Sequence, residues 1–264
     1  MELFLFYKDL ESTSSCFSNQ LSGIIIDWEG KNKFERQAKY DTQINDHTLD
    51  DLKVLRAATQ IPILVRINGF PEFVEGEVEA AIENGANEIL LPMVENSSQV
   101  QKALEVINNR CKLGILIETE NGINNLDEIL KMDISRLYIG LNDLSIDRKS
   151  KNIFMPFLDG TLKKLRERIK IPFGYGGLTH AMEGSPISCN LLLTHMISLK
   201  TDFTFLRRSF YNSLSQYSAG EIYNSIDQEV QLIHSLSDKD ILPRNENLTR
   251  QIMNFDVYDI QLHN

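Results

Sequence analysis

The chain has 264 residues, of which 27 are basic and 37 acidic, so its formal net charge at pH 7 is −10. This acidic balance argues against a protein that binds nucleic acid through a broad basic surface. Hydrophobic residues make up 42% of the sequence and charged residues 24%, a balance typical of a folded domain and not of a disordered chain.

Eight short apolar runs recur along the chain and predict eight β-strands. Each run is too short for a core helix, and most do not alternate with polar residues, which is typical of strands buried on both faces of a parallel sheet. The predicted strands lie at residues 2–7, 23–27, 61–67, 87–92, 113–118, 136–141, 171–175 and 202–206.

Segments with the helical spacing of apolar residues follow most of these runs. Thr48 and Asp51 have the spacing of a capping box at the start of one helix. Pro71 suits the first turn of the next predicted helix, and Gly85 suits the position just after its end. The predicted helices cover residues 48–59, 71–84, 97–109, 122–132, 158–169, 185–199 and 219–236.

The alternation of eight strands with helices predicts the α/β class and a closed (β/α)8 TIM barrel, which commonly needs about 250 residues. The glycine fingerprints of nucleotide-binding open sheets are absent from the sequence. We assign a single barrel domain to residues 1–236 and a C-terminal extension to 237–264, which is apolar enough to pack on the barrel or on a neighbouring subunit. Residues 28–47 are predicted as a long loop, a length more often functional than structural.

Cysteine usage and hydropathy indicate a cytoplasmic protein. Cys16, Cys111 and Cys189 are widely spaced and form neither a disulfide framework nor a pattern of zinc spacing. The first residues show no basic leader or cleavage pattern, and no segment approaches the roughly 18 apolar residues of a membrane span. We therefore expect no membrane partner and no nucleic-acid partner.

Charged residues stand at the predicted carboxyl ends of several strands, which face the active site in this fold. They are Asp27, Glu29, Arg66, Glu118 and Asp143. Glu118 and Asp143 are about one α-plus-β repeat apart, so we expect them side by side. Two such carboxylates suit a hard divalent cation such as Mg²⁺, which takes one or two protein carboxylates. The alternative is that one carboxylate caps a helix while the other bonds to Lys or Arg.

Three further features have both a functional and a structural interpretation. Arg66 either binds a substrate carboxylate or enolate oxygen, or neutralises the acidic cluster inside the barrel. The GYGG segment at 174–177 follows the seventh predicted strand and either admits a ligand or forms a plain turn. His47 and His180 either face the barrel mouth or have surface or structural roles.

Five motifs in chain order, GIIIDWE, LVRIN, GANEILLPMVEN, GILIETENGINNLDEI and LYIGLNDLS, are similar to those of the HpcH/HpaI aldolase and citrate lyase β-subunit family. This family is a branch of the phosphoenolpyruvate/pyruvate barrel superfamily. The resemblance implies an enzyme dependent on Mg²⁺ or Mn²⁺ that makes or breaks a carbon–carbon bond next to a carbonyl. Family members of this kind are usually oligomers whose C-terminal segment reaches toward a neighbouring active site.

The resemblance also implies roles for individual residues. Glu118 and Asp143 fall on metal-ligand positions, and Arg66 falls on the arginine that contacts the substrate oxygen and steadies the enolate. Asp27 and Glu29 fall on the catalytic acidic motif. The residues expected to bind substrate are Arg66, Pro92, Met93 and, in the GYGG segment, Gly176.

The sequence departs from the family pattern at several places. Gly30 stands where the hydroxy-oxo-diacid aldolases have a histidine, so the general base is not assigned. Lys33 and Arg36 resemble the basic pair of citrate lyase-like and malyl-CoA lyase-like members, but no site for coenzyme A is visible, which leaves a coenzyme A thioester possible but unsupported.

We therefore predict a homo-oligomeric, metal-dependent aldolase or carbon–carbon lyase that acts on a small molecule through the enolate of a 2-oxo acid or of a short acyl thioester. One alternative is another reaction of the phosphoenolpyruvate/pyruvate type. The other is a non-catalytic barrel that serves as a binding scaffold.

Overall fold

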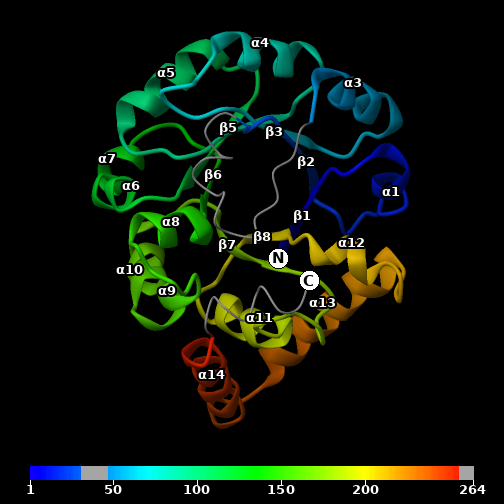
Figure 1. Ribbon diagram of the computed structural model, residues 1–264, viewed down its shortest axis with the longest axis vertical. Coiled ribbons are helices and arrows are strands. Elements are labelled where there is room, and N and C mark those ends of the chain that lie inside the picture. The colour runs from blue at the N-terminus through cyan, green and yellow to red at the C-terminus, as the bar shows by residue number, and fades with distance from the viewer. Residues whose placement is uncertain (31–46, 256–264) are drawn as a thin grey trace.

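The eight apolar runs form eight parallel strands that close into one barrel in sequence order, as Figure 1 shows for the computed structural model. The structure describes residues 1–30 and 47–255. The predicted (β/α)8 barrel is therefore confirmed. The strands are β1 (Glu2–Phe6), β2 (Gly23–Asp27), β3 (Ile63–Arg66), β4 (Glu88–Leu91), β5 (Lys112–Ile117), β6 (Arg136–Ile139), β7 (Phe173–Leu178) and β8 (Phe203–Leu206).

Helices surround the barrel and cover the outer face of the strands (Figure 1). No helix in the described part of the chain is long and apolar enough to cross a membrane. The helices are α1 (Leu10–Ser14), α3 (Leu49–Ala58), α4 (Glu75–Glu83), α5 (Ser97–Ile107), α6 (Glu120–Asn124), α7 (Leu126–Ile129), α8 (Leu141–Asp147), α9 (Met155–Leu158), α10 (Thr161–Arg168), α11 (Cys189–Ser198), α12 (Ser209–Ser213), α13 (Ala219–Ser235) and α14 (Asp238–Met253).

Two of the predicted local signals are confirmed and one is wrong. Thr48 and Asp51 form a capping box at the start of α3, and Gly85, with a φ of +90°, follows the C-cap of α4. Pro71 does not begin a helix, because α4 starts only at Glu75. The rings of Phe70 and Phe73 stack with centroids 4.7 Å apart, so this segment packs as a turn before the helix.

The GYGG segment lies inside β7 and not after it, which corrects its predicted position. Gly174 pairs with Phe203 of β8 and Gly177 pairs with Phe205, with a register shift between them. A Cβ atom at Gly174 would come within 2.6 Å of the Phe203 ring, so glycine is required where these strands meet. Most of the predicted long loop, with Lys33 and Arg36, lies outside the described residues.

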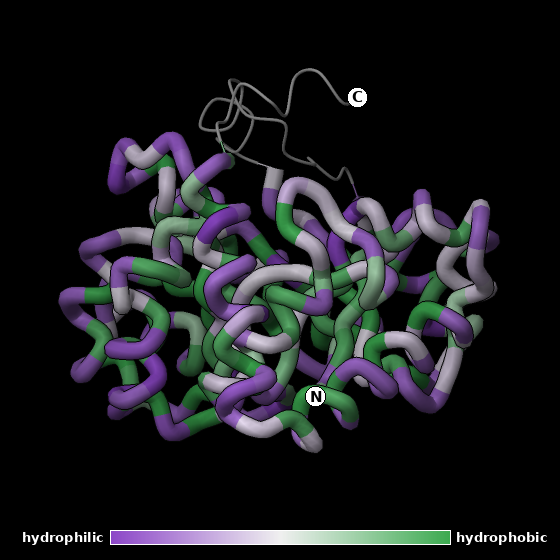
Figure 2. Tube along the Cα trace, turned by 90° about the horizontal axis from the view of Figure 1, so that it is seen from below, coloured by the Kyte–Doolittle hydropathy of each residue, from purple (hydrophilic) through white to green (hydrophobic). Residues whose placement is uncertain are grey.

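Apolar side chains fill both the barrel interior and the space between strands and helices. Figure 2 shows hydrophobic residues gathered along the inner segments and hydrophilic residues on the periphery. Because the interior is packed, a site can form only at the ends of the barrel. The interior side chains are Phe4, Ile25, Leu64, Leu90, Leu116, Phe203 and Phe205.

A closed network fills the end of the barrel where the strands begin. Arg136 of β6 pairs with Glu88 of β4 at 2.9 Å and with Glu2 of β1 at 2.9 Å. Its guanidinium also lies over the rings of Phe4 and Phe203. Because Arg136 is ion-paired with these carboxylates, this end of the barrel stabilises the fold. The opposite end is the candidate for the active site.

The described part of the C-terminal extension is α14, which packs against α11 of the same chain (Figure 1). Leu248 and Ile252 of α14 are buried, and Asn152 Nδ2 donates a hydrogen bond of 2.7 Å to the Ile252 carbonyl. Leu242 and Met253 on the same helix are exposed. The helix therefore buries one face on its own barrel and leaves apolar side chains elsewhere on its surface.

Candidate active site

Strand register brings Asp27 and Arg66 together at the carboxyl ends of β2 and β3. The two residues are direct partners across the parallel pair. Arg66 Nε donates to Asp27 Oδ1 at 2.8 Å and Nη2 donates to Asp27 Oδ2 at 2.7 Å. The fork of the guanidinium thus meets both carboxylate oxygens, and Glu29 Oε2 lies 3.4 Å from the same Nε.

Glu118 follows β5 directly and its carboxylate turns toward β6. The register pairs Ile117 with Ile139, so Gly140 is the residue opposite Glu118. A Cβ atom at Gly140 would collide with the Glu118 carboxylate, so the glycine makes room for it. On the other side, Met93 N–H donates to Glu118 Oε2 at 3.1 Å, and Met93 holds the uncommon φ of 54°.

The mouth carries more buried negative charge than positive charge. Asp143, in the first turn of α8, is buried, as are Asp27, Glu29 and Glu118. Burial and the charges of Asp143 and Glu29 raise the pKa of Glu118 to about 8, against the opposing charge of Arg66. Burial lowers the pKa of Arg66, but the charges of Asp27 and Glu29 outweigh it and raise that pKa above its ordinary value.

The donor set suits a hard divalent cation. Glu118 and Asp143 supply carboxylate oxygens, the ligands that Mg²⁺ and Mn²⁺ prefer, and their mutual repulsion would fall if a cation lay between them. Among residues 1–30 and 47–255, no group of three or more His, Cys, Asp or Glu side chains forms a metal-binding arrangement. Two protein carboxylates are enough for Mg²⁺, which usually keeps several waters.

Three aromatic rings, Phe6, Tyr138 and Phe205, form an aromatic floor beneath the charged cluster. Tyr138 stacks on Phe205 with centroids 3.9 Å apart, and Phe6 meets Phe205 edge-on at 5.5 Å. The guanidinium of Arg66 lies 5.2 Å from the centroid of Phe6. We did not predict these residues, although the two-residue period of inward positions along β1, β6 and β8 would have pointed to them.

A second group missed from the sequence supports the acidic turn after β2. Asn68 Oδ1 accepts from Gly30 N–H at 3.2 Å, while Asn68 Nδ2 donates to the Trp28 carbonyl at 3.2 Å and to Glu77 Oε1 at 2.9 Å. These bonds tie the turn that carries Glu29 to α4. The signal in the sequence was the position of Asn68, two residues after Arg66 on the same strand end.

The predicted substrate-binding residues occupy different parts of the mouth. Met93 touches Glu118 through its backbone, and the Pro92 carbonyl lies 2.8 Å from where a Cβ of Gly69 would be, so glycine permits this close turn. Gly176 has a φ of +73°, and its carbonyl accepts a hydrogen bond from the Tyr138 hydroxyl. Gly176 therefore contacts the aromatic floor through Tyr138. Its contact with substrate stays a prediction.

The two histidines differ in where they lie. His47 Nδ1 accepts the backbone N–H of Asp27 at 2.9 Å, so His47 contacts the acidic motif and is neutral when this bond forms. The ring of His180 stacks on Tyr217 at 4.2 Å and has a packing role. Cys111 is no candidate nucleophile, because burial raises the pKa of its thiol to about 11.

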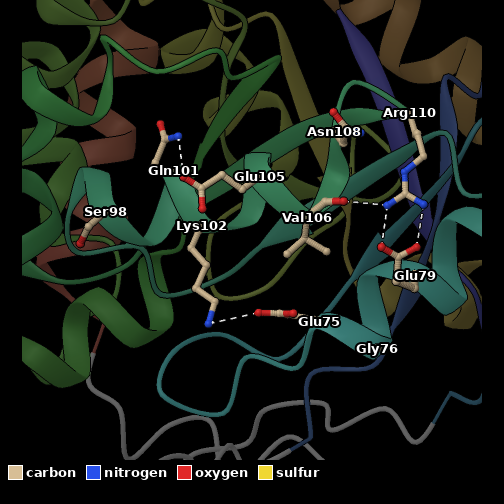
Figure 3. A pocket seen from close by; sticks show the side chains of 10 residues that line it. All are labelled: Glu75, Gly76, Glu79, Ser98, Gln101, Lys102, Glu105, Val106, Asn108 and Arg110. Atoms are coloured by element: carbon tan, nitrogen blue, oxygen red, sulfur yellow. Dashed lines mark hydrogen bonds and ion pairs between the residues drawn. The ribbon is translucent and has the colours of Figure 1, made fainter.

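An open groove of about 830 Å³ lies on the outer surface between α4 and α5 (Figure 3). Both of its basic residues are paired within the groove: Arg110 meets Glu79 at 2.6 Å, and Lys102 lies 3.3 Å from Glu75, while Glu105 accepts a hydrogen bond from Gln101 at 2.9 Å. The residues that line it lie on α4, on α5 or in the turn that follows α5, away from the carboxyl ends of the strands. We therefore assign no chemistry to the groove.

A closed parallel barrel with buried carboxylates and an arginine at the carboxyl ends of its strands defines the class of (β/α)8 barrel enzymes. Within this class, the chain belongs to the HpcH/HpaI aldolase/citrate lyase family, whose model matches residues 2–153. The resemblance seen in the motifs is thus confirmed. Membership makes the protein an enzyme of the aldolase or lyase kind.

Solved structures share the fold at low sequence identity. The HpcH/HpaI aldolase/citrate lyase family protein from Burkholderia cenocepacia J2315 is 13% identical, with a TM-score of 0.61 over 88% of this chain and 94% of that one. The HpcH/HpaI aldolase from Desulfitobacterium hafniense DCB-2 is 12% identical, with a TM-score of 0.57 over 90% and 93%. RipC from Yersinia pestis is 15% identical, with a TM-score of 0.55 over 91% and 97%. No curated protein matches the sequence significantly.

Proposed function

We propose that this protein is a divalent-metal-dependent carbon–carbon lyase or aldolase that acts through the enolate of a 2-oxo acid or of a short acyl thioester. The observation that carries the proposal is the buried cluster in which Arg66, held by Asp27, lies beside the mutually repelling carboxylates of Glu118 and Asp143. A packed scaffold has no need of so many buried charges at one mouth.

Each charged residue has a role in this proposal. Glu118 and Asp143 would hold Mg²⁺ or Mn²⁺, which when bound supplies a Lewis acid for the oxygens of the substrate. Arg66 binds the developing enolate oxygen, and Asp27 orients its guanidinium through both carboxylate oxygens. Glu29, 3.4 Å from the Arg66 Nε, adds a second carboxylate to the acidic motif beside the reacting atoms.

The uncharged residues complete the pocket. The aromatic floor closes the barrel beneath the cluster, which keeps water away from the reacting atoms and strengthens the electrostatic interactions there. Pro92, Met93 and Gly176 line the mouth and position the small-molecule substrate. Lys33 and Arg36, which bear on a coenzyme A thioester, lie outside the described residues.

The test is metal-dependent cleavage of a panel of hydroxy-oxo acids and acyl-CoA thioesters, with release of pyruvate, oxaloacetate or acetyl groups as the readout. We expect product only when Mg²⁺ or Mn²⁺ is present and loss of product after treatment with a chelator. Conversion of phosphoenolpyruvate instead would favour the other reaction of the superfamily. Binding of these compounds without turnover of any would favour the scaffold.

Metal binding should depend on pH through Glu118, whose pKa of about 8 leaves it largely protonated at pH 7. We expect Mn²⁺ binding at pH 7 to release a proton, and the affinity to rise as the pH approaches 8 and then level off. Calorimetry in two buffers of different ionisation enthalpy measures this release. Equal heats in both buffers would contradict the prediction.

The same pKa shift has a consequence for the stability of the metal-free protein. The folded state holds the Glu118 proton more tightly than the unfolded state, in which the pKa is near its ordinary 4.5. Stability from this group is therefore present below about pH 4.5 and is lost as the pH rises through 8. Saturating Mn²⁺ should reverse the loss, because it binds only the folded protein.

We also propose a homo-oligomer in which the C-terminal extension, residues 237–264, contacts a neighbouring subunit. Leu242 and Met253 of α14 support this proposal, because these residues are 58% and 66% exposed on the chain by itself. Truncation after Ser237 should produce smaller species and lower activity, as measured by light scattering and turnover. A double variant, Leu242→Ser with Met253→Ser, keeps the contacts of α14 within its own chain and should dissociate as well.

A monomeric full-length chain, or a truncated chain that assembles as before, would contradict the oligomer. Thermal unfolding serves as the control in these experiments. Truncation also uncovers the face of α11 on which Leu248 and Ile252 pack, whereas the double variant leaves that face covered.

A further inference from the structure

Arg207 extends the inward face of β8 to the mouth of the barrel. Phe203 and Phe205 of β8 point into the barrel, and Arg207 is the next residue at the same two-residue spacing. Its N–H still donates to the Leu178 carbonyl of β7 at 2.8 Å, so its backbone continues the sheet. In the closed strand order, β8 lies opposite β4, across the mouth from the strands that carry Arg66 and Glu118.

Tyr138 of the aromatic floor is influenced by the charges of Arg66 and Glu118 on one side of the mouth and by the charge of Arg207 on the other. Burial raises the pKa of Tyr138 and Glu118 raises it further, while Arg66 and Arg207 act in the opposite direction. Phe205, whose ring stacks on Tyr138, is two residues before Arg207 on the inward face of β8. Arg207 therefore borders the same floor as the proposed catalytic cluster.

Arg207 has no carboxylate within ion-pair distance among residues 1–30 and 47–255. Its Nη1 donates to the Ser185 carbonyl at 3.3 Å and its Nη2 contacts Cys189 Sγ at 3.2 Å, both neutral groups. Its Nε is buried and has no hydrogen-bond partner in this part of the chain. The other inward arginines, Arg66 and Arg136, each meet two carboxylates.

A partly buried guanidinium without a matching anion is costly, and the cost falls when an anion binds. The planar donors of arginine suit a carboxylate, which can accept two hydrogen bonds. If the 2-oxo acid group binds at Arg66 and Glu118, as the proposed function requires, the far end of a longer substrate points across the floor toward β8.

We propose that Arg207 is a specificity-determining residue that binds a second carboxylate at the far end of the substrate, so that dicarboxylic 2-oxo acids are preferred over monocarboxylic ones. This inference rests on the proposed function. The competing interpretation is structural: Arg207 would only clamp the segment between β7 and α11 through Ser185 and Cys189.

Two uncleavable ligands of equal chain length separate these interpretations. 2-Oxopentanedioate and 2-oxopentanoate share the 2-oxo acid end, and only the first has a carboxylate at the far end. Calorimetry with the Mn²⁺-loaded full chain should show that the dicarboxylate binds about 10–100-fold more tightly, the usual value of hydrogen bonds to a charged group. Arg207→Gln should bring the ratio of the two affinities toward one, and Arg207→Lys should keep part of the preference.

Arg168→Gln is the matched control, because it removes an arginine that pairs with Asp127 on the outer helices. It should leave the ratio of affinities unchanged. Equal binding of the two ligands to the wild type, or an equal loss for both in Arg207→Gln with a lower melting temperature, would overturn the inference in favour of the clamp. If neither ligand binds, the proposed function fails and the inference fails with it, whereas failure of the preference alone leaves the proposed function standing.

Discussion

Glu118→Ala and Asp143→Ala should each abolish measurable Mn²⁺ binding and metal-dependent turnover while the barrel stays folded. Each change removes one of the two carboxylates proposed to hold the cation. The loss should exceed the 10–100-fold that even outer-shell partners of a metal usually cost. Folding should survive, because removal of one buried carboxylate relieves its repulsion with the other in the metal-free protein.

Calorimetry with Mn²⁺ measures the affinity, and circular dichroism with thermal unfolding measures the fold. Glu88→Gln is the matched control, since Glu88 is also a buried carboxylate but lies at the opposite end of the barrel with Arg136. It should lower stability and leave Mn²⁺ affinity as in the wild type. Unchanged Mn²⁺ affinity in both the Glu118 and the Asp143 variant would contradict the assignment of the metal site.

Arg66→Lys should lower turnover by about 10²–10³-fold although the positive charge is kept, as expected when one donor to a developing oxyanion is lost. Lysine cannot reproduce the two parallel hydrogen bonds that Arg66 makes with Asp27, so it cannot be held in one orientation. The effect should fall mainly on kcat, because the interaction is strongest in the transition state.

Arg136→Lys provides the matched control for this change. Arg136 is another inward-pointing arginine whose guanidinium pairs with a buried glutamate, but it lies where the strands begin. Its replacement should lower the melting temperature and leave kcat nearly as in the wild type. Turnover of Arg66→Lys close to the wild type would mean that Arg66 only neutralises the acidic cluster.

The barrel could be predicted from local patterns because its strands are buried on both faces. A run such as GIIID is apolar at every position before its final acid, which few structures other than a central parallel strand require. The predicted start of a helix at Pro71 failed because the stacking of Phe70 on Phe73 joins residues that no helical pattern relates. The sequence predicts the GYGG segment outside its strand because glycine is a weak strand former, whereas its actual pairing with β8 depends on the neighbouring rings.

The candidate site was likewise predictable from the sequence only in part. Asp27, Arg66 and Glu118 could be located at strand ends from the sequence, because a charged residue that closes an apolar run stands out. The sequence did not show that Asp27 and Arg66 form a two-point pair, since that depends on the register between β2 and β3. Nor did it show why position 140 is glycine, which follows from the place of the Glu118 carboxylate on the next strand.

The sequence by itself determined the strand and helix order and the family, because these are encoded in apolar periodicity and in short contiguous motifs. Only the tertiary structure decided how the charges are matched. Arg66 and Arg136 both point into the barrel, yet each is neutralised by carboxylates from other strands, whereas Arg207 has none among the described residues. Which charges meet depends on strand register and closure of the barrel, and these join positions far apart in the chain.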